Sequence, residues 1–384
     1  MRSDLDPQKL RLLVVGDVRS RRTTLLAEAA ARHDFDVIVI SYADFLTRCH
    51  DRDWIRPGTF VRIESPGDDK ETTRLILKSG IVSMERMHRV PITATEIDAR
   101  SFERGEVLHP RQWFLGFKDI LQQMEFLWSH QGIRWMNSPE SIVTSFDKQS
   151  CLDRWVEAGL PTAPGYREIQ TYSQLRGVVA ERHRRLFIKP RYGYSAIGAM
   201  ALEWRDHLVR AITTVDVTWD SGRPRLFVTK RPRVLQREFE IAWLIDTLAM
   251  EEIVVEDWLP KARWNSVPFD LRVVTIGGRA QHVVGRANHS PFTNLNLDAR
   301  RIERDDIETH LGEAWTHVLA LAEHAAARIS TGYLGMDLLV RPCRRQCVVL
   351  EANAFGDYLP GLLFQGETTY DTEMRLCGAV GKLQ

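Results

Sequence analysis

Two acidic residues near the C-terminal end of the sequence have the spacing that most directly indicates chemistry. Alternation along a strand places Asp337 on one face of residues 335–340 and Glu351 on one face of residues 349–353. A turn centred near Arg344 would bring Asp337 opposite Glu351. Two carboxylates that face each other among apolar neighbours repel, so we expect a cation between them.

Asp337, Glu351 and Asn353 also form a suitable set of oxygen ligands for a hard divalent ion. At such sites magnesium is bound by carboxylates, an amide oxygen and the oxygens of a nucleotide polyphosphate. The alternative is a solvated strand face whose charges pair with arginines such as Arg341 or Arg345. This motif alone does not separate the two interpretations.

The elements that must position this hairpin are predicted from periodicity. Apolar residues recur with helical spacing at 117–128 and 151–156, and a stretch rich in proline at 161–165 marks a boundary between sub-structures. A further helix is expected at 311–326, before the two strands of the hairpin at 334–340 and 347–352. Between these helices, β-rich runs predict an antiparallel sheet, at residues 186–189, 226–229, 238–245, 253–255 and 271–276.

The first part of the chain has the pattern of a parallel α/β unit. Apolar runs at 11–16 and 37–40 flank an Ala- and Leu-rich stretch at 23–32, which predicts strand, helix, strand. The loop at 16–21 lacks the glycine spacing of a dinucleotide fingerprint, so we interpret the unit as a scaffold. The role of the arginine cluster from Arg19 to Arg22 stays open, with substrate contact as one hypothesis.

Composition sets the broad class of the protein. A chain of 384 residues, 44% hydrophobic and 27% charged, is expected to form two or three packed globular units. Its 52 basic and 51 acidic residues create no overall field for nucleic acid or a membrane surface, so we expect neither as a partner. The first ten residues lack the apolar core of a signal peptide, and five scattered cysteines do not form a disulfide framework. We therefore expect a cytoplasmic protein.

Several motifs stand in order along the second half of the chain. They are residues 137–142 with 147–148 and 158–162, then 187–190, 254–261, 269–278, 336–338 and 350–353. In this order they resemble the motifs of the ATP-grasp superfamily, particularly its glutathione-synthetase-like and ribosomal-protein glutamate-ligase-like branch.

The resemblance implies an α/β chain that is α+β in its catalytic part. It implies an ATP-grasp domain over 137–384, preceded by a Rossmann-like parallel α/β domain over 1–136. Within the larger part we expect a small nucleotide-clamping subdomain at about 150–255 and a metal-carrying core at about 256–384.

The resemblance also assigns the nucleotide contacts. It implies that Lys148 and Lys189 reach the phosphates and that the loop containing Gly193 and Ser195 closes over them, although its few glycines leave the detailed contacts open. The run 254–261 resembles the hinge strand that lines the adenine pocket. Glu256 would face the adenine amino group or the ribose there; the alternative is an ordinary salt-bridge partner. The implied nucleotide-binding residues are Lys148, Lys189, Gly193, Ser195, Glu256, Asp257, Leu259, Lys261 and Asp270.

The remaining roles concern the reacting groups. Asp270 begins the family's Asp-apolar-Arg strand, in which Arg272 and the later Arg286 would contact the phosphoryl group or acceptor, as suits their paired donors. Asn294 would border the metal site, for which Asp337, Glu351 and Asn353 are the expected ligands. The segment 354–361 is expected to line the acceptor pocket with Asp357 and Tyr358 exposed, the alternative being a capping turn.

Together these features imply an ATP- and Mg2+-dependent carboxylate–amine ligase that acts through an acyl phosphate, with Mn2+ as an alternative metal. An amino acid or peptide is the expected substrate, and a homodimer is one option by analogy with relatives. A kinase that stops at phosphoryl transfer and a non-catalytic ATP-binding regulator stay open as alternatives. The spacing of Cys343 and Cys347 would suit zinc, but no second ligand pair is nearby, so an ordinary turn is expected.

Overall fold

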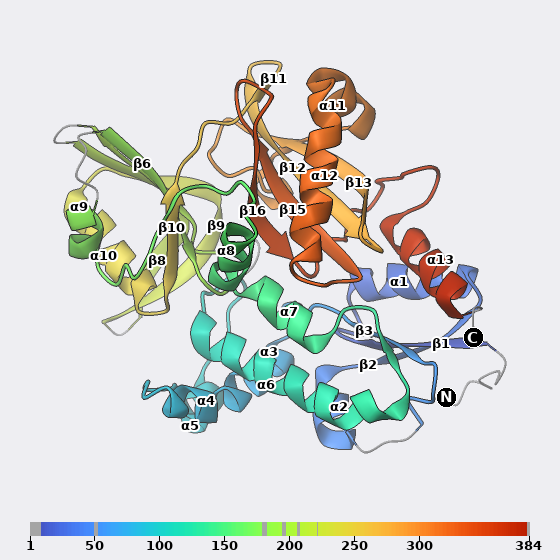
Figure 1. Cartoon of the computed structure of the whole chain (residues 1–384). Helices are drawn as coiled ribbons and strands as arrows, with labels where there is room; N and C mark the ends of the chain where they lie inside the picture. The colour runs from blue at the N-terminus through green and yellow to red at the C-terminus, as the bar shows by residue number, and fades with distance from the viewer. Residues whose placement is uncertain are drawn as a thin grey trace.

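The computed structural model describes residues 9–49, 53–178, 183–193, 197–205, 208–220 and 222–381. Three sheets and the helices between them make up these parts of the chain (Figure 1). One sheet is parallel and two are antiparallel, which confirms the mixed α/β class with a parallel unit at the N-terminus.

The parallel sheet has the strand order β2-β1-β3-β4. Its strands are β1 (Leu10–Val15), β2 (Phe35–Ile40), β3 (Phe60–Ile63) and β4 (Arg134–Trp135). In β1, the side chains of Leu12, Leu13, Val14 and Val15 are fully buried, as expected for a strand covered on both faces. The associated helices are α1 (Arg21–Arg32), α2 (Tyr42–Arg48), α3 (Lys70–Ser79), α4 (Ile81–Arg86), α5 (Ala94–Ala99) and α6 (Pro110–Trp128), which the 3-10 turn η1 (Ser129–Gln131) follows.

Helix α6 contains the predicted helical run and lies against α3 at a crossing that requires glycine. A Cβ atom added to Gly116 would lie 1.8 Å from the carbonyl oxygen of Ile76 and 2.7 Å from the amide nitrogen of Gly80. The two helices therefore touch through their backbones, which fixes the position of the aromatic residues at the start of α6.

The second sheet has the order β5-β10-β6-β7-β8-β9 and lies to the left in Figure 1. It comprises β5 (Gly165–Tyr166), β6 (His183–Pro190), β7 (Met200–Arg205), β8 (Leu208–Asp220), β9 (Arg223–Leu235) and β10 (Ile253–Asp257). Helices α9 (Tyr172–Val178) and α10 (Glu238–Ala249) pack on one of its faces. Two further helices, α7 (Pro139–Phe146) and α8 (Lys148–Glu157), connect the parallel sheet to this region.

The third sheet has the order β14-β13-β12-β15-β16, and the short β11 pairs with β12. It comprises β11 (Arg263–Trp264), β12 (Val267–Ile276), β13 (Arg279–Ala287), β14 (Arg300–Ile302), β15 (Tyr333–Val340) and β16 (Cys347–Asn353), with the 3-10 turn η2 (Leu295–Leu297) before β14. Its apolar face packs on α11 (Arg304–Leu311) and α12 (Ala314–Ala327). The last helix, α13 (Thr369–Gly381), returns to pack beside α1 (Figure 1).

Two predicted elements are corrected by the structure. Residues 238–245 are not a strand but the start of α10, whose buried residues Ile241, Leu244, Ile245 and Leu248 have helical spacing. The helix expected over 311–326 is interrupted at Gly312, where α11 ends before α12 begins.

The division at residues 136 and 137 stays a prediction. The four strands of the parallel sheet come from residues 10–135, whereas α13, from the far end of the chain, packs with them in one apolar cluster. Among the described helices, none is long and apolar enough to cross a membrane.

Candidate functional site

Cross-strand register places a row of charged residues on one face of the third sheet. Asp337 of β15 lies opposite Glu351 of β16, as the sequence predicts, and opposite Arg272 of β12 on its other side. Asp270, two residues before Arg272 and so on the same face, lies opposite Arg286 of β13. The intervening residues, such as Leu271 and Val273, face the helices α11 and α12. The sheet is therefore apolar on one side and charged on the other.

Asp337 is surrounded by arginines. Arg272 donates to it through Nε at 2.5 Å and Nη2 at 3.2 Å, and Arg286 Nη2 lies 3.2 Å from the same carboxylate. Burial alone would raise the pKa of Asp337, but the two guanidinium groups outweigh burial and lower it. Asp337 is therefore charged, and its partners are not Arg341 or Arg345, the arginines considered from the sequence.

A second acid, Asp270, is bound by three partners. Arg286 Nε donates to it at 2.9 Å, Lys261 Nζ donates at 2.9 Å, and the hydroxyl of Thr293 also donates to it. Burial opposes the charge of Asp270, but Arg286 and Lys261 outweigh burial and lower its pKa. Burial also lowers the pKa of Lys261, although Asp270 opposes this shift. Thr293 was not singled out by sequence reasoning, and its position beside the predicted Asn294 was the available signal.

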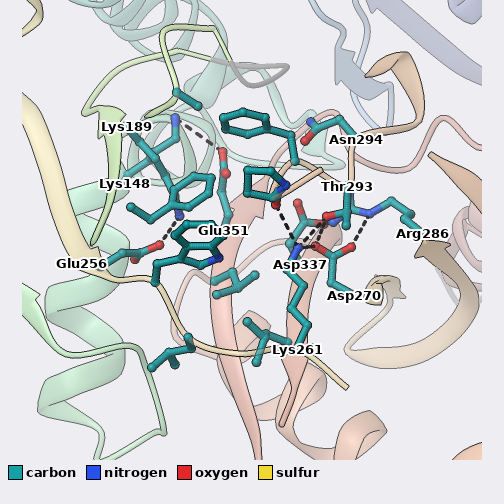
Figure 2. Close-up of a pocket in the computed structure, with 18 of the residues that line it drawn as sticks. Lys148, Lys189, Glu256, Lys261, Asp270, Arg286, Thr293, Asn294, Asp337 and Glu351 are labelled. Atoms are coloured by element: carbon teal, nitrogen blue, oxygen red, sulfur yellow. Dashed lines mark hydrogen bonds and ion pairs between the residues drawn. The ribbon is translucent and has the colours of Figure 1, made fainter. Parts of the chain in front are cut away.

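Lys148 is the first residue of α8 and points toward Glu351. Asp147 caps this helix by accepting hydrogen bonds from the amides of Gln149 and Ser150. The cap fixes the start of the helix and therefore the position of Lys148. Lys148 Nζ donates to the carbonyl oxygen of Gly193 at 2.6 Å and lies 3.4 Å from Glu351 Oε1. The lysine thus links the loop after β6 to the carboxylate of β16 (Figure 2).

Lys189 of β6 forms a buried ion pair with Glu256 of β10. The two strands are adjacent and antiparallel, and Lys189 Nζ lies 2.6 Å from Glu256 Oε1. Burial opposes the charge of Lys189, but the carboxylates of Glu256 and Glu351 outweigh it and raise its pKa. Glu256 is thus an ion-pair partner, and its expected contact with the adenine amino group or the ribose stays a prediction. Figure 2 shows both lysines on the side of the cavity nearest to Glu351.

These groups surround one cavity, which we call the inner cavity, with an empty volume of about 820 Å³. It opens between the second and third sheets (Figure 2). Apolar side chains such as Phe187, Trp258 and Leu339 supply part of its wall. The predicted residues that line it are Lys148, Lys189, Gly193, Glu256, Asp257, Leu259, Lys261, Asp270, Arg286, Asn294, Asp337 and Glu351.

A second space, which we call the outer cleft, adjoins the inner cavity and reaches the parallel sheet. It has an empty volume of about 1810 Å³ and shares Arg286, Asn294, Asp337 and Glu351 with the inner cavity. Arg272 and Asn353, the other predicted residues, line this cleft. Its far side is formed by the loops that follow β1 and β3, including Asp17 and Gly67. The cleft therefore connects the charged face of the third sheet to the N-terminal unit.

The structure brings together all but one of the residues singled out from the sequence, because Ser195 lies outside the described residues. The roles assigned to these residues stay predictions. Cys343 and Cys347 are both free thiols, the first exposed and the second half-buried. Of the arginine cluster, Arg21 and Arg22 both line the outer cleft, and Arg22 is also held by Glu64 and Asp357 at 2.9 Å each.

The segment 354–361 behaves only partly as expected. Tyr358 lines the outer cleft, but Asp357 is fully buried, not exposed, because it pairs with Arg22 and Arg62. The segment folds back under β15: a Cβ on Gly335 would lie 2.6 Å from the Cα of Gly356, and Arg272 Nη1 donates to the carbonyl of Gly356 at 3.1 Å. Asp357 thus anchors the segment that follows Asn353.

The donor set fits magnesium. Asp337 and Glu351 face the same cavity, and Asn353 lines the adjoining cleft, so two carboxylates and one amide supply hard oxygen ligands. Among the described residues, no group of three or more His, Cys, Asp or Glu side chains could hold a metal. An ion at this position would need further oxygen ligands from outside the chain, which the phosphates of a nucleotide provide.

Comparison with known proteins rests on structure alone. No family model matches the chain, and no curated protein matches it in sequence. Among solved structures, the ATP-grasp ligase PsnB with its minimal precursor is 17% identical, with a TM-score of 0.54 over 98% of this chain and 100% of that one. D-alanine–D-alanine ligase from Bacillus anthracis is 12% identical, with a TM-score of 0.52 over 98% and 99%. PurK, an N5-carboxyaminoimidazole ribonucleotide synthetase, is 12% identical, with a TM-score of 0.50 over 98% and 78%. At these identities the likeness establishes a shared fold.

Proposed function

Because the chain has the ATP-grasp fold, we propose that it is an ATP- and magnesium-dependent ligase that joins a carboxylate to an amine through an acyl phosphate. The observation that carries this proposal is the convergence of Asp337 and Glu351 with Lys148 and Lys189 on one cavity. Two acids for a divalent ion and two lysines for phosphates are what an ATP site requires, and they come from four separate elements.

The inner cavity would hold the nucleotide. Phe187, Trp258 and Leu259 offer apolar walls for adenine, and the backbone of β10 and the residues after it can bind the edge of the ring. Lys148 and Lys189 would then contact the phosphates, exchanging their present partners Glu351 and Glu256 for phosphate oxygens. Magnesium bound by Asp337, Glu351 and Asn353 would neutralise the phosphate charge, and manganese, which also prefers oxygen ligands, could replace it.

The reaction would proceed in two displacements. An oxygen of the substrate carboxylate attacks the γ-phosphorus of ATP, and the bond to the β,γ-bridging oxygen breaks to release ADP. The amine then attacks the acyl carbon, inorganic phosphate leaves, and the amine loses its proton. Arg272 and Arg286 line the outer cleft beside the acids, where their guanidinium groups can orient the carboxylate and stabilise the phosphoryl oxygens.

The outer cleft would bind the substrates. An amino acid or peptide suits this cleft, because residues of both charges line it and because it extends from the third sheet to the N-terminal unit. Two of the structural neighbours support this proposal, since PsnB was solved with its minimal precursor and another is a D-alanine–D-alanine ligase. We place the enzyme in the cytoplasm, because its five cysteines are all free thiols. We propose no role for nucleic acid or a membrane.

The decisive test is a turnover screen with ATP and Mg2+ across amino acids and short peptides, with ADP release and product mass as readouts. A ligase releases ADP only when carboxylate and amine are both present, and its product has lost one water relative to the two substrates. ADP release without an amine, with a phosphorylated product, would identify a kinase instead. Binding of ATP without turnover of any substrate in the screen would favour a regulator.

A further inference from the structure

A third space, which we call the aromatic compartment, opens from the two already described. It has an empty volume of about 1500 Å³. It shares Gly193 and Ile197 with the inner cavity and Trp113, Phe146 and Asn296 with the outer cleft. The three spaces therefore adjoin one another through shared wall residues, so the third lies next to the space in which a substrate would react beside Asp337.

Aromatic rings form one side of the wall of this compartment. Trp113 stacks on Phe146 with their centroids 6.1 Å apart, and Phe114 stacks on Tyr192 at 4.3 Å. Phe114, Phe146 and Tyr192 are held rigidly, each at most 7% exposed. Rigid aromatic walls favour flat or bulky apolar groups, because ring edges and faces make ordered contacts at little entropic cost.

The wall is assembled from distant parts of the chain. Trp113 and Phe114 come from α6, Tyr192 follows β6, and Val228 comes from β9. The segment before α6 is fastened to β9: Val107 N donates to the carbonyl of Leu226 and Val228 N donates to the carbonyl of Gly105, both at 2.8 Å. The compartment is thus closed by a backbone connection between the N-terminal unit and the second sheet.

The buried charge in this wall is neutralised. The buried carboxylate of Glu106 accepts hydrogen bonds from Arg100 at 2.6 Å and from Arg225 at 2.8 Å and 2.9 Å. The other charged residues of the wall include Asp68 and Arg104, which lie 3.7 Å apart and are 66% and 90% exposed. The compartment therefore offers apolar contact inside and charge at the solvent boundary, the arrangement of a side-chain specificity pocket.

From this geometry we propose that the aromatic compartment binds an aromatic or large apolar side chain of the amino acid or peptide that the enzyme ligates. The inference rests on the proposed function, because it takes the reacting groups to lie beside Asp337. It adds the chemical class of the substrate: the reacting end lies in the outer cleft, and the apolar group is seated against Trp113 and Phe146.

The test uses the full-length protein saturated with ADP and Mg2+ and two probes, N-acetyl-phenylalanine amide and N-acetyl-alanine amide. Burial of the phenyl group should make the first probe bind about tenfold more tightly or better, by calorimetry. Equal affinity for the two probes, or no measurable binding of either while ADP binds, would overturn the compartment and leave the ligase proposal intact. A protein that binds no ADP would instead contradict the proposed function.

Filling the compartment provides the matched comparison. Val228→Trp adds an indole to a residue of its wall, whereas Val234→Trp makes the same change on the same strand at a residue that is 49% exposed and lines none of the three spaces. Val228→Trp should remove the preference for the phenylalanine probe, and Val234→Trp should retain it. Leu108→Trp, from another part of the wall, repeats the test should Val228→Trp fail to bind ADP. A preference that survives a filling variant with normal ADP affinity would refute the assignment.

Discussion

Two clusters of buried charge both contact the segment that follows β16, and they differ in what surrounds them. The site cluster faces the inner cavity and the outer cleft. The other, which we call the sealed cluster, lies between the parallel sheet, α1 and α13, and most of its side chains are at most 1% exposed. The site cluster comprises Lys261, Asp270, Arg272, Arg286 and Asp337; the sealed cluster comprises Arg22, Arg62, Glu64, Asp357 and Glu373.

Their charge balance differs in sign. The site cluster has three cations for two carboxylates, so it has one positive charge in excess and faces a space that an anion can enter. The sealed cluster has two arginines for three carboxylates, and a buried excess of negative charge is removed most easily by a bound proton. The pKa values agree, because burial and the neighbouring acids raise the pKa of Glu373, whereas the arginines overcome burial and lower that of Asp357. The sign of the excess charge, and whether the cluster faces an open space, thus distinguish the site cluster from the sealed cluster.

The strongest test of the sealed cluster is Arg62→Met. Arg62 donates to Glu64 at 2.8 Å, also binds Asp357 and Glu373, and lies 3.8 Å from the ring centre of Tyr333. Removing it leaves buried carboxylates without their cation, which should lower the free energy of unfolding by about 3–5 kcal/mol. Urea denaturation measures this change.

The control is Arg32→Met, which breaks an ion pair with Asp371 from an arginine that is 54% exposed. An exposed pair contributes at most about 1 kcal/mol, so the control should remain near the wild type. A similar loss in both variants would mean that the sealed cluster has no special structural role.

At the candidate functional site, Glu351→Gln removes the negative charge of one proposed metal ligand and leaves the shape of the side chain nearly unchanged. ATP turnover that depends on magnesium should fall by at least about a hundredfold, because the phosphate charge is no longer neutralised. The melting temperature should change little, since the partner of Glu351 is Lys148 at 3.4 Å in an open cavity. Glu308→Gln on the exposed surface of α11 is the control, and near-normal turnover in Glu351→Gln would exclude the metal assignment.

The hairpin that carries these acids could be predicted because the residue pattern that defines it lies within one short stretch of sequence. A side-chain period of two and one turn were enough to pair Asp337 with Glu351, although the irregularity between Asp337 and Leu338 could not be foreseen. The arginines around Asp337 were harder to place. The sequence predicts that Arg272 and Arg286 contact the phosphoryl group or the acceptor, whereas their contact with Asp337 depends on β12 lying between β13 and β15.

The wrong predictions also arise because contacts between distant parts of the chain decide the structure. In residues 238–245 apolar residues alternate, as in a strand, but packing on the second sheet selects the helical set that includes Ile241 and Leu244. Asp357 carries no local signal of burial, because its partners Arg22 and Arg62 are 335 and 295 residues away. Contacts of such sequence separation cannot be inferred from one sequence by pattern alone.

Lys189→Ala tests the phosphate contact with a smaller effect. Loss of a charge-assisted contact should weaken ATP binding by about tenfold to a hundredfold, measured by calorimetry. Because the change also leaves Glu256 buried without its partner, the double variant Lys189→Ala/Glu256→Gln should restore stability but not affinity. Lys230→Ala, at an exposed lysine of β9, controls for the loss of charge. Unchanged ATP affinity in the single variant would remove Lys189 from the site.

The smallest effect is the pH dependence of the sealed cluster. Because the pKa of Glu373 is raised in the folded protein, the folded state retains a proton that the unfolded chain releases above its ordinary pKa of about 4.3. Stability from this group is thus complete below that pH and declines as pH rises toward the folded pKa, by at most about 1.4 kcal/mol per pH unit.

Glu373→Gln keeps the neutral form at every pH, so its stability relative to the wild type should increase from pH 5 to pH 7 in urea denaturation. Asp357→Asn, whose acid has a lowered pKa, should destabilise the protein throughout that range. If Glu373→Gln were as damaging as Asp357→Asn, Glu373 would be an ordinary charged partner of Arg62, and the contrast in charge balance between the two clusters would fail.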